Sequence, residues 1–256
     1  DVVYIQYLFH YTVLFSLLFS VLLGKKIILC PRGSFSRFTL SNKRSCLKKL
    51  WLFLVISSLK KRIIWQASSY LEKEDVLSYF PKADVKIIAD GIDVNSFSNS
   101  NKIDKKELLK KYTNKDFEDV SDVVLSMGRL HKIKGFDILI DAFKLYQDEN
   151  KNAKLLIAGS DHGVRNELEE QIKKLKLEDS VFLIGLVNFD QKKELLSNCS
   201  FFSLCSDFES FGIVVSESLS CGTPVVVSDK TFWKDIERNN CGIFAKNQKA
   251  NFCTAF

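Results

Sequence analysis

The chain has 256 residues, of which 46% are hydrophobic and 27% are charged, which argues against wholesale disorder and allows one large or two modest domains. Its net charge of +6 and pI of about 8.8 are only mildly basic and do not indicate a dedicated nucleic-acid-binding protein. Seven cysteines without a CxxC pair and three scattered histidines give no metal-binding pattern, so we expect no metal cofactor.

An apolar run, residues 7–23, follows the strand-like residues 1–6. Its 17 residues lie at the lower limit for a membrane-spanning helix, and Lys25 and Lys26 follow it. The alternative is a buried helix between two parallel strands, the second strand being KKIILC at residues 25–30. His10, Thr12 and the serines inside the run favour this buried helix.

Basic residues concentrate in the first third of the chain, in the clusters Lys25-Lys26, Lys43-Arg44, Lys48-Lys49 and Lys60-Lys61-Arg62. Such clusters between apolar segments suit an anionic membrane surface, although solvated helix faces have the same composition. The basic amphipathic segment CLKKLWLFLVISSLKKR, residues 46–62, therefore either touches a membrane or forms a buried helix with charged ends.

Strands and helices alternate along the rest of the chain. After the loop Pro31-Arg32-Gly33, we expect a helix over residues 46–60, a strand at 62–68, a helix at 70–79 and a short strand at 85–89. The polar residues 95–121 read as a linker with one short helix at 105–112. Strands at 123–128, 154–160, 181–185, 201–206 and 223–229 then alternate with helices at 136–149, 165–176, 190–197 and 213–220.

This alternation predicts an α/β fold with two domains. Residues 1–118 would be the back part of a first Rossmann-like domain with its linker, and residues 119–256 a second, doubly wound Rossmann-like domain. The chain opens on a strand without an initiating Met and closes without a clear helix stop, so we expect a piece of a longer protein.

Ligands of open α/β sheets bind beyond the carboxyl ends of the strands, where three loops of the second domain carry candidate residues. In the first loop, which begins at Gly128, Arg129 offers a planar fork and Lys134 a point charge, a pair suited to a diphosphate. Gly135 lets the backbone come close where the next helix begins. A basic loop in solvent is the alternative.

The second loop gives weaker indications. Gly159 ends one strand and Val187 follows the next, and backbone groups there could pair with the edge of a nucleobase. Glycine after a strand is common, so this pattern alone does not identify a site.

The third loop contains Glu209 and the turn Ser210-Phe211-Gly212, before a helix that starts at Ile213 and includes Glu217. Amides at a helix start favour an anion or sugar hydroxyls. If the whole stretch were helical, the two carboxylates would lie about 12 Å apart, beyond the roughly 5–9.5 Å of hydrolytic carboxylate pairs. Two separate ligand contacts fit better, although a non-helical Glu209 leaves a shared bond open.

The motif E-S-F-G-x4-E-S-L-S-C-G-T-P-V-V, at residues 209–226, resembles the E-x7-E signature of glycosyltransferase family 4, the group 1 glycosyltransferases of GT-B fold. GRLHKIKGFDILIDAF resembles the family's glycine-arginine and lysine-glycine segment, and LLIAGSD and VFLIGLV lie in order between the two. Upstream, CPRGSF, QASSYLE and ADGIDVNSF resemble the acceptor-side domain, so nearly the whole chain is covered.

The resemblance implies a retaining transferase that uses a nucleotide-sugar donor without a metal. Arg129 and Lys134 would hold the diphosphate and stabilise the leaving nucleotide, and Glu217 would bind the ribose hydroxyls. Glu209, with the backbone of Phe211, Gly212 and Ile213, would contact the donor sugar and its phosphate, and Val187 would lie near the base.

The chain departs from the family pattern at two positions. Gln6 stands where the family commonly has a histidine, so no catalytic histidine is assigned. Asp90 stands where asparagine is usual before Gly91, which we interpret as a turn-tolerant exchange.

The leading hypothesis is a cytoplasmic, membrane-peripheral enzyme that transfers a sugar to a saccharide or lipid-linked acceptor in surface polysaccharide synthesis. The alternatives are a non-catalytic donor-binding fragment or degenerate homologue, and a protein anchored by residues 7–23. No nucleic-acid partner is expected.

Overall fold

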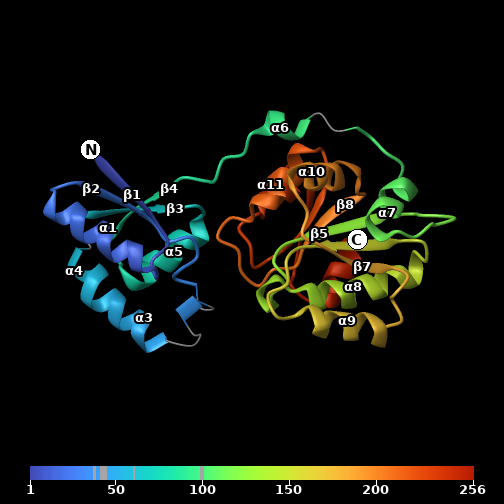
Figure 1. Ribbon diagram of the computed structural model, residues 1–256, viewed down its shortest axis with the longest axis horizontal. Helices are drawn as coiled ribbons and strands as arrows, with labels where there is room; N and C mark the ends of the chain where they lie inside the picture. Colours follow the sequence, from blue (N-terminus) through green and yellow to red (C-terminus); the bar gives the residue numbers. More distant parts are fainter. Residues whose placement is uncertain (37–38, 41–44, 60, 99–100) are drawn as a thin grey trace. The chain divides into compact units, whose positions relative to one another are not determined.

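The computed structural model describes residues 1–36, 39–40, 45–59, 61–98 and 101–256 (Figure 1). The predicted basic residues Lys43, Arg44 and Lys60 lie outside these described residues. The chain divides into two compact units, one made of Asp1–Gly91 with Glu209–Phe211 and the other of Ile92–Phe208 with Gly212–Phe256. The division after Gly91 comes earlier in the chain than the boundary at 118/119 that we expected.

The first unit contains a sheet of four parallel strands in the order β1-β2-β3-β4, which run along Val2–Gln6, Lys26–Cys30, Ile63–Ala67 and Asp84–Ile87. The crossovers are helical, as parallel pairing requires. They are formed by α1 (Tyr11–Leu22), by α3 (Ser45–Trp51) with the π-helical turn η1 (Leu52–Ile56) and α4 (Ser57–Leu59), and by α5 (Tyr70–Tyr79). The predicted strand–helix–strand order is confirmed.

Helix α1 is shorter than the apolar run that predicted it. His10 caps its start by accepting a hydrogen bond from the backbone N–H of Thr12, and the helix has 12 residues. Val13 and Leu17 bury one side of it in the core of the first unit. Among the described residues, no helix is both long and apolar enough to cross a membrane.

The segment that we expected to be a linker packs with the second unit. Helix α6 (Val94–Ser98) was not predicted, and Phe97 in it is buried in the core of the second unit. Helix α7 (Lys105–Thr113) confirms the predicted short helix, and it buries Leu108 and Leu109 in the same core. These apolar side chains explain why residues 92–118 group with the second unit rather than the first.

The second unit contains a sheet of six parallel strands in the order β10-β9-β8-β5-β6-β7. These strands are β5 (Val123–Met127), β6 (Lys154–Ala158), β7 (Val181–Gly185), β8 (Phe201–Leu204), β9 (Val225–Ser228) and β10 (Gly242–Ala245). The helices are α8 (Phe136–Glu149), α9 (Arg165–Lys174), α10 (Phe189–Asn198), α11 (Ile213–Ser220), α12 (Asp235–Arg238) and α13 (Lys249–Ala255). From β5 the chain builds one half of the sheet through β6 and β7, then returns to add β8 on the other side of β5.

Helices cover both faces of this six-stranded sheet, as a doubly wound fold requires (Figure 1). On β5, Val124 belongs to the cluster that contains α8, α9 and α13, whereas Val123 and Leu125 belong to the cluster that contains α7, α10 and α11. This alternation follows from the two-residue side-chain period of a strand. The predicted doubly wound domain is confirmed, and α12, β10 and α13 add to it.

Candidate functional site

The six-stranded sheet reverses its strand order between β5 and β8. Loops that leave two neighbouring parallel strands toward opposite halves of a sheet open a crevice between them, where ligands of doubly wound proteins bind. The loop after β5 is the predicted first loop, residues 128–135, and the loop after β8 begins the predicted third loop. The fold thus brings to one point two loops that are about 70 residues apart in sequence.

Gly135 joins these two loops. It has a left-handed backbone (φ 63°) at the start of α8, and a Cβ built on it would lie 2.2 Å from the backbone oxygen of Cys205, just after β8. Only glycine fits such a position without strain. The backbone N–H of Asp207 also donates to the oxygen of Ile133 (2.9 Å). The basic loop is therefore fixed against the end of β8.

The basic side chains of the first loop gather close together. The aliphatic stem of Lys134 folds over Gly128, since a Cβ built on Gly128 would lie 3.3 Å from Lys134 Cε. Burial lowers the pKa of His131, and the positive charges of Arg129 and Lys134 and the neighbouring His162 lower it further. Arg129 and Lys134 together make a local positive field of the kind that attracts an anion.

Backbone contacts extend the site along the sheet edge to the second loop. The N–H of Gly159 donates to the oxygen of Gly185 (2.7 Å), and a Cβ on Gly159 would lie 1.7 Å from the oxygen of Gly128. Gly159 therefore allows the ends of β5, β6 and β7 to meet. Asp161 caps the start of α9, because its Oδ1 accepts hydrogen bonds from the backbone N–H groups of residues 163–165.

Val187 is half-buried and packs against the core that contains α10 and α11. It lies two residues beyond the end of β7, at the same edge of the sheet as the two glycine-rich strand ends. That Val187 lies near the base of a bound nucleotide stays a prediction.

Helix α11 carries those candidate residues of the third loop that belong to the second unit, Gly212, Ile213 and Glu217. Gly212 begins the helix in a left-handed conformation (φ 77°) and no side chain of the described residues caps it, so the first amides, including that of Ile213, can bind an anion. Glu217 is the fifth residue of the helix and is only 7% exposed. Lys192 donates a hydrogen bond to its Oε1, so this buried carboxyl group has a cationic partner.

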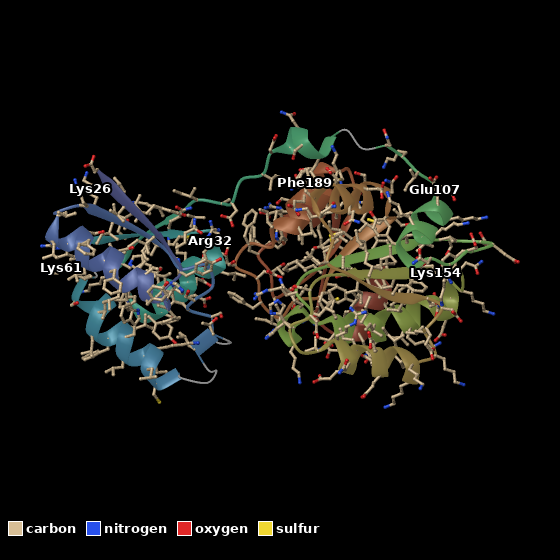
Figure 2. The ribbon with its side chains drawn as sticks, viewed as in Figure 1. Lys26, Arg32, Lys61, Glu107, Lys154 and Phe189 are labelled. Carbon is tan, nitrogen blue, oxygen red and sulfur yellow. The ribbon has the colours of Figure 1, made fainter. Side chains whose placement is uncertain are left out.

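Lys192 was not predicted as a site residue. It comes from α10, which begins at Phe189 (labelled in Figure 2). The ammonium of Lys192 lies 5.6 Å from the ring centre of Phe97 and 5.5 Å from that of Phe189. The two rings restrict where the ammonium can lie and thereby orient the carboxylate that it contacts. No local sequence pattern could reveal this, because the ion pair joins residues 25 positions apart on different helices.

The residues Glu209, Ser210 and Phe211 lie in sequence between β8 and α11, but their contacts group them with the first unit. None of the three is helical, so the distance expected for a continuous helix from Glu209 to Glu217 does not apply. Their roles toward a sugar therefore stay predictions.

Two acidic side chains whose contacts we did not predict, Glu72 and Asp90, hold the loops that follow β2, β3 and β4 of the first unit. Glu72 is 1% exposed and accepts hydrogen bonds from the N–H of Gly33 (2.6 Å) and from the N–H and Oγ of Ser68 (both 2.7 Å). Such bonds offset the cost of burying a carboxylate. Asp90 accepts from the guanidinium of Arg32 and raises the pKa of Arg32. Asp90 therefore forms an ion pair in addition to its predicted place in the turn before Gly91.

The described residues contain no group of three or more His, Cys, Asp or Glu side chains placed to hold a metal ion. Within the second unit, the arrangement combines a positive loop, uncapped helix amides and a buried, oriented carboxylate. Its chemistry suits a ligand with a diphosphate at one end and hydroxyl groups at the other.

Comparison with known proteins gives the family of the chain. The family model described as "Glycosyl transferases group 1" matches residues 109–252. An uncharacterized glycosyltransferase of Methanocaldococcus jannaschii is 34% identical over 180 residues, which cover 68% of this chain and 45% of that protein. N-acetylgalactosamine-N,N'-diacetylbacillosaminyl-diphospho-undecaprenol 4-alpha-N-acetylgalactosaminyltransferase of Campylobacter jejuni is 38% identical over 125 residues, covering 47% of this chain and 32% of that protein.

The fold is similar to solved structures as well. The crystal structure of Anabaena HepE in complex with UDP and glucose has a TM-score of 0.78 at 20% identity, covering 99% of this chain and 66% of that one. The two parallel α/β units are those of the GT-B fold, as we expected. The chain spans less than half the length of each of these two relatives, 45% of the first and 32% of the second.

The positive field of the first loop can be tested through His131. We expect its imidazole to titrate below the ordinary histidine range, because burial and the charges of Arg129 and Lys134 oppose protonation. Arg129→Ala should raise the pKa of His131 in an NMR titration. Lys132→Ala is the matched control. The Nζ of Lys132 lies 3.3 Å from Oε2 of Glu167, so its removal should leave the titration of His131 unchanged. An equal shift in both variants would contradict the proposed arrangement.

Proposed function

The chain belongs to the group 1 glycosyltransferase family, and we propose that it provides the donor site of a retaining enzyme that transfers a sugar from a nucleotide-sugar to a saccharide acceptor. The observation that carries this proposal is the fixed contact between the basic loop after β5 and the end of β8, through Gly135 and Cys205. It holds Arg129 and Lys134 next to the chain that leads into α11.

In the proposed reaction the diphosphate of the donor binds Arg129 and Lys134. These cations stabilise the negative charge that develops on the nucleotide as the bond to the sugar breaks. No metal is required for this step, because the two side chains supply the compensating charge. The proposed ribose contact is Glu217, held in place by Lys192.

The donor sugar is assigned to Glu209, together with the backbone of Ser210, Phe211, Gly212 and Ile213. The acceptor hydroxyl attacks from the face on which the nucleotide leaves, and close positioning of the two supplies much of the rate. The backbone of Gly128 and Gly159 and the side chain of Val187 form the proposed end of the site for the base.

The acceptor is proposed to be lipid-linked and the product a surface polysaccharide, assembled at the inner face of the plasma membrane by a cytoplasmic, peripheral protein. The name of the Campylobacter relative includes a diphospho-undecaprenol acceptor, which supports this choice. The basic segment that contains α3 and α4 supports contact with an anionic membrane surface.

A second candidate is a donor-binding protein without catalysis. Gln6, at a position where the family commonly has a histidine, favours it, whereas the family residues Arg129, Lys134, Glu209 and Glu217 favour the enzyme. Turnover of nucleotide-sugars by the full-length protein separates the two candidates, since the second would bind a donor and release no sugar.

Nucleotide binding tests the proposal directly. Calorimetry of this chain with UDP, GDP and ADP should find one nucleotide that binds, with UDP the first probe because the Anabaena neighbour was crystallised with it. Arg129→Ala and Lys134→Ala should each weaken that binding roughly 10- to 100-fold, the loss expected for a charge-assisted hydrogen bond of about 1.5–3 kcal/mol.

Lys132→Ala is the control for charge. It removes a cation from the same loop, but the ammonium of Lys132 pairs with Glu167 and is not assigned to the diphosphate. Binding of no nucleotide, or equal losses in all three variants, would contradict the assignment of the diphosphate.

The ribose contact makes a separate prediction. Glu217→Gln should weaken UDP roughly tenfold, because the amide replaces a charged acceptor of the ribose hydroxyls, about 1–2 kcal/mol. It should leave 2′,3′-dideoxy-UDP unaffected, since that analogue lacks the hydroxyls. Glu194→Gln is the control, because Glu194 on α10 pairs with Lys111. An equal loss for both nucleotides would assign Glu217 a structural role instead.

A further inference from the structure

The first unit contains a cavity of about 770 Å³ that none of the proposed donor contacts uses. This volume lies within the roughly 300–1,000 Å³ that is typical of small-ligand pockets. Its apolar wall includes Leu52 and Phe53 from η1 and Phe80 from the end of α5. Leu52 and Phe53 lie in a π-helical turn, an irregular form that is frequent at functional sites. The cavity is therefore large enough, and apolar enough, for a hydrocarbon chain.

Three lysines line the same cavity: Lys49 on α3, Lys61 just before β3 and Lys82 just before β4. All three are exposed, and none forms an ion pair with any residue that the structure describes. No Asp or Glu is among the lining residues. An apolar cavity with uncompensated cations at its wall is complementary to an anionic amphiphile.

The sequence around the cavity is also rich in basic residues and poor in acidic ones. Residues 2–71 contain eleven Lys and Arg residues and no Asp or Glu. Next to the cavity, Leu47, Leu50 and Leu54 are spaced three and four residues apart and are exposed by 63%, 51% and 58%, and Phe53 beside them is exposed by 72%. Such an exposed apolar row among lysines is typical of helices that lie in a membrane interface.

The cavity lies away from the edge where a donor and an acceptor would react. Lys61 and Lys82 precede β3 and β4, at the amino ends of the strands, whereas the loops fixed by Glu72 follow the carboxyl ends of β2 and β3. Ligands that react in open α/β sheets bind at the carboxyl ends. The occupant of this cavity is therefore not the reacting acceptor.

The apolar face of α1 makes a useful contrast. Tyr11, Phe15, Phe19 and Leu22 are more than half exposed, but α1 itself contains no lysine or arginine that would select an anionic partner. The cavity beside α3 and η1, in contrast, has both apolar and basic side chains in its wall.

We propose that this cavity binds an anionic membrane phospholipid, with its phosphate between Lys61 and Lys82 and one acyl chain against Leu52, Phe53 and Phe80. The inference deepens the proposed membrane association and rests on it. It gives the basic segment a specific lipid site in addition to a general attraction to negative surfaces. Lipid bound there would hold the first unit at the membrane where a lipid-linked acceptor resides.

Calorimetry with dihexanoyl phosphatidylglycerol, a water-soluble short-chain lipid, tests the site without a membrane surface. We expect saturable binding that is at least tenfold tighter than that of dihexanoyl phosphatidylcholine. The double variant Lys61→Ala/Lys82→Ala should lose roughly 25-fold in affinity, given about fivefold for each lysine near an anionic lipid. Lys173→Ala/Lys174→Ala, which removes the same charge from exposed positions on α9, should bind as the unchanged chain does.

Filling the cavity gives an independent variant. Ala83→Trp places a large ring in the cavity and should abolish binding of the short-chain lipid while circular dichroism shows an unchanged fold. Ser57→Trp, at another lining residue, serves if Ala83→Trp fails to fold. Flotation with phosphatidylglycerol vesicles should fall in parallel with the loss of short-chain lipid.

Three results would overturn the proposal. They are equal binding of the two short-chain lipids, binding unaffected by both the lysine and the tryptophan variants, and full competition by inorganic phosphate, which would indicate an anion site without a lipid chain. UDP binding measured on the same variants keeps the two proposals apart. A variant that loses lipid binding but still binds UDP has changed the cavity only. If the unchanged chain does not bind UDP, that result contradicts the donor site and leaves the lipid site untouched.

Discussion

The approach of Gly135 to the backbone oxygen of Cys205 is the contact on which the candidate site depends. Parallel pairing of β5 with β8 puts the two loops at the point where the strand order reverses, but pairing alone does not bring the loops together. A residue without a side chain does so, because any Cβ at position 135 would collide with the chain that leaves β8. Arg129 and Lys134 belong to the loop that this contact holds against the end of β8.

The polar side of the site is ordered by charge rather than by backbone. Glu217 is nearly buried, and an isolated carboxylate there would be costly. Lys192 offsets that cost, and two aromatic rings from α6 and α10 hold the ammonium in turn. Phe97, which lies in the stretch 95–121 that we predicted to be a linker, thus contributes a ring to the site. This explains why α6 must pack with the second unit if Glu217 is to be oriented.

The sequence pattern predicted most of the fold and part of the site. Helices such as α8 and α11 and the strand β7 were confirmed at their expected bounds, because each has a clear period and a glycine or polar boundary. Lys192, Phe97 and the pair Arg32–Asp90 were missed, since each depends on a partner that only the folded chain brings near. Glu209 was identified by its motif, but its position could not follow from helical spacing because its loop is irregular.

The central claim is that the loops after β5 and β8 bind one nucleotide diphosphate together. Hydrogen exchange of the chain with and without saturating UDP, read by mass spectrometry, tests it most directly. The account predicts slower exchange in peptides that cover residues 128–135 and in those that cover 209–217, with no change across α9 at Arg165–Lys174. Protection of only one of the two loops, or protection confined to other parts of the chain, would contradict it.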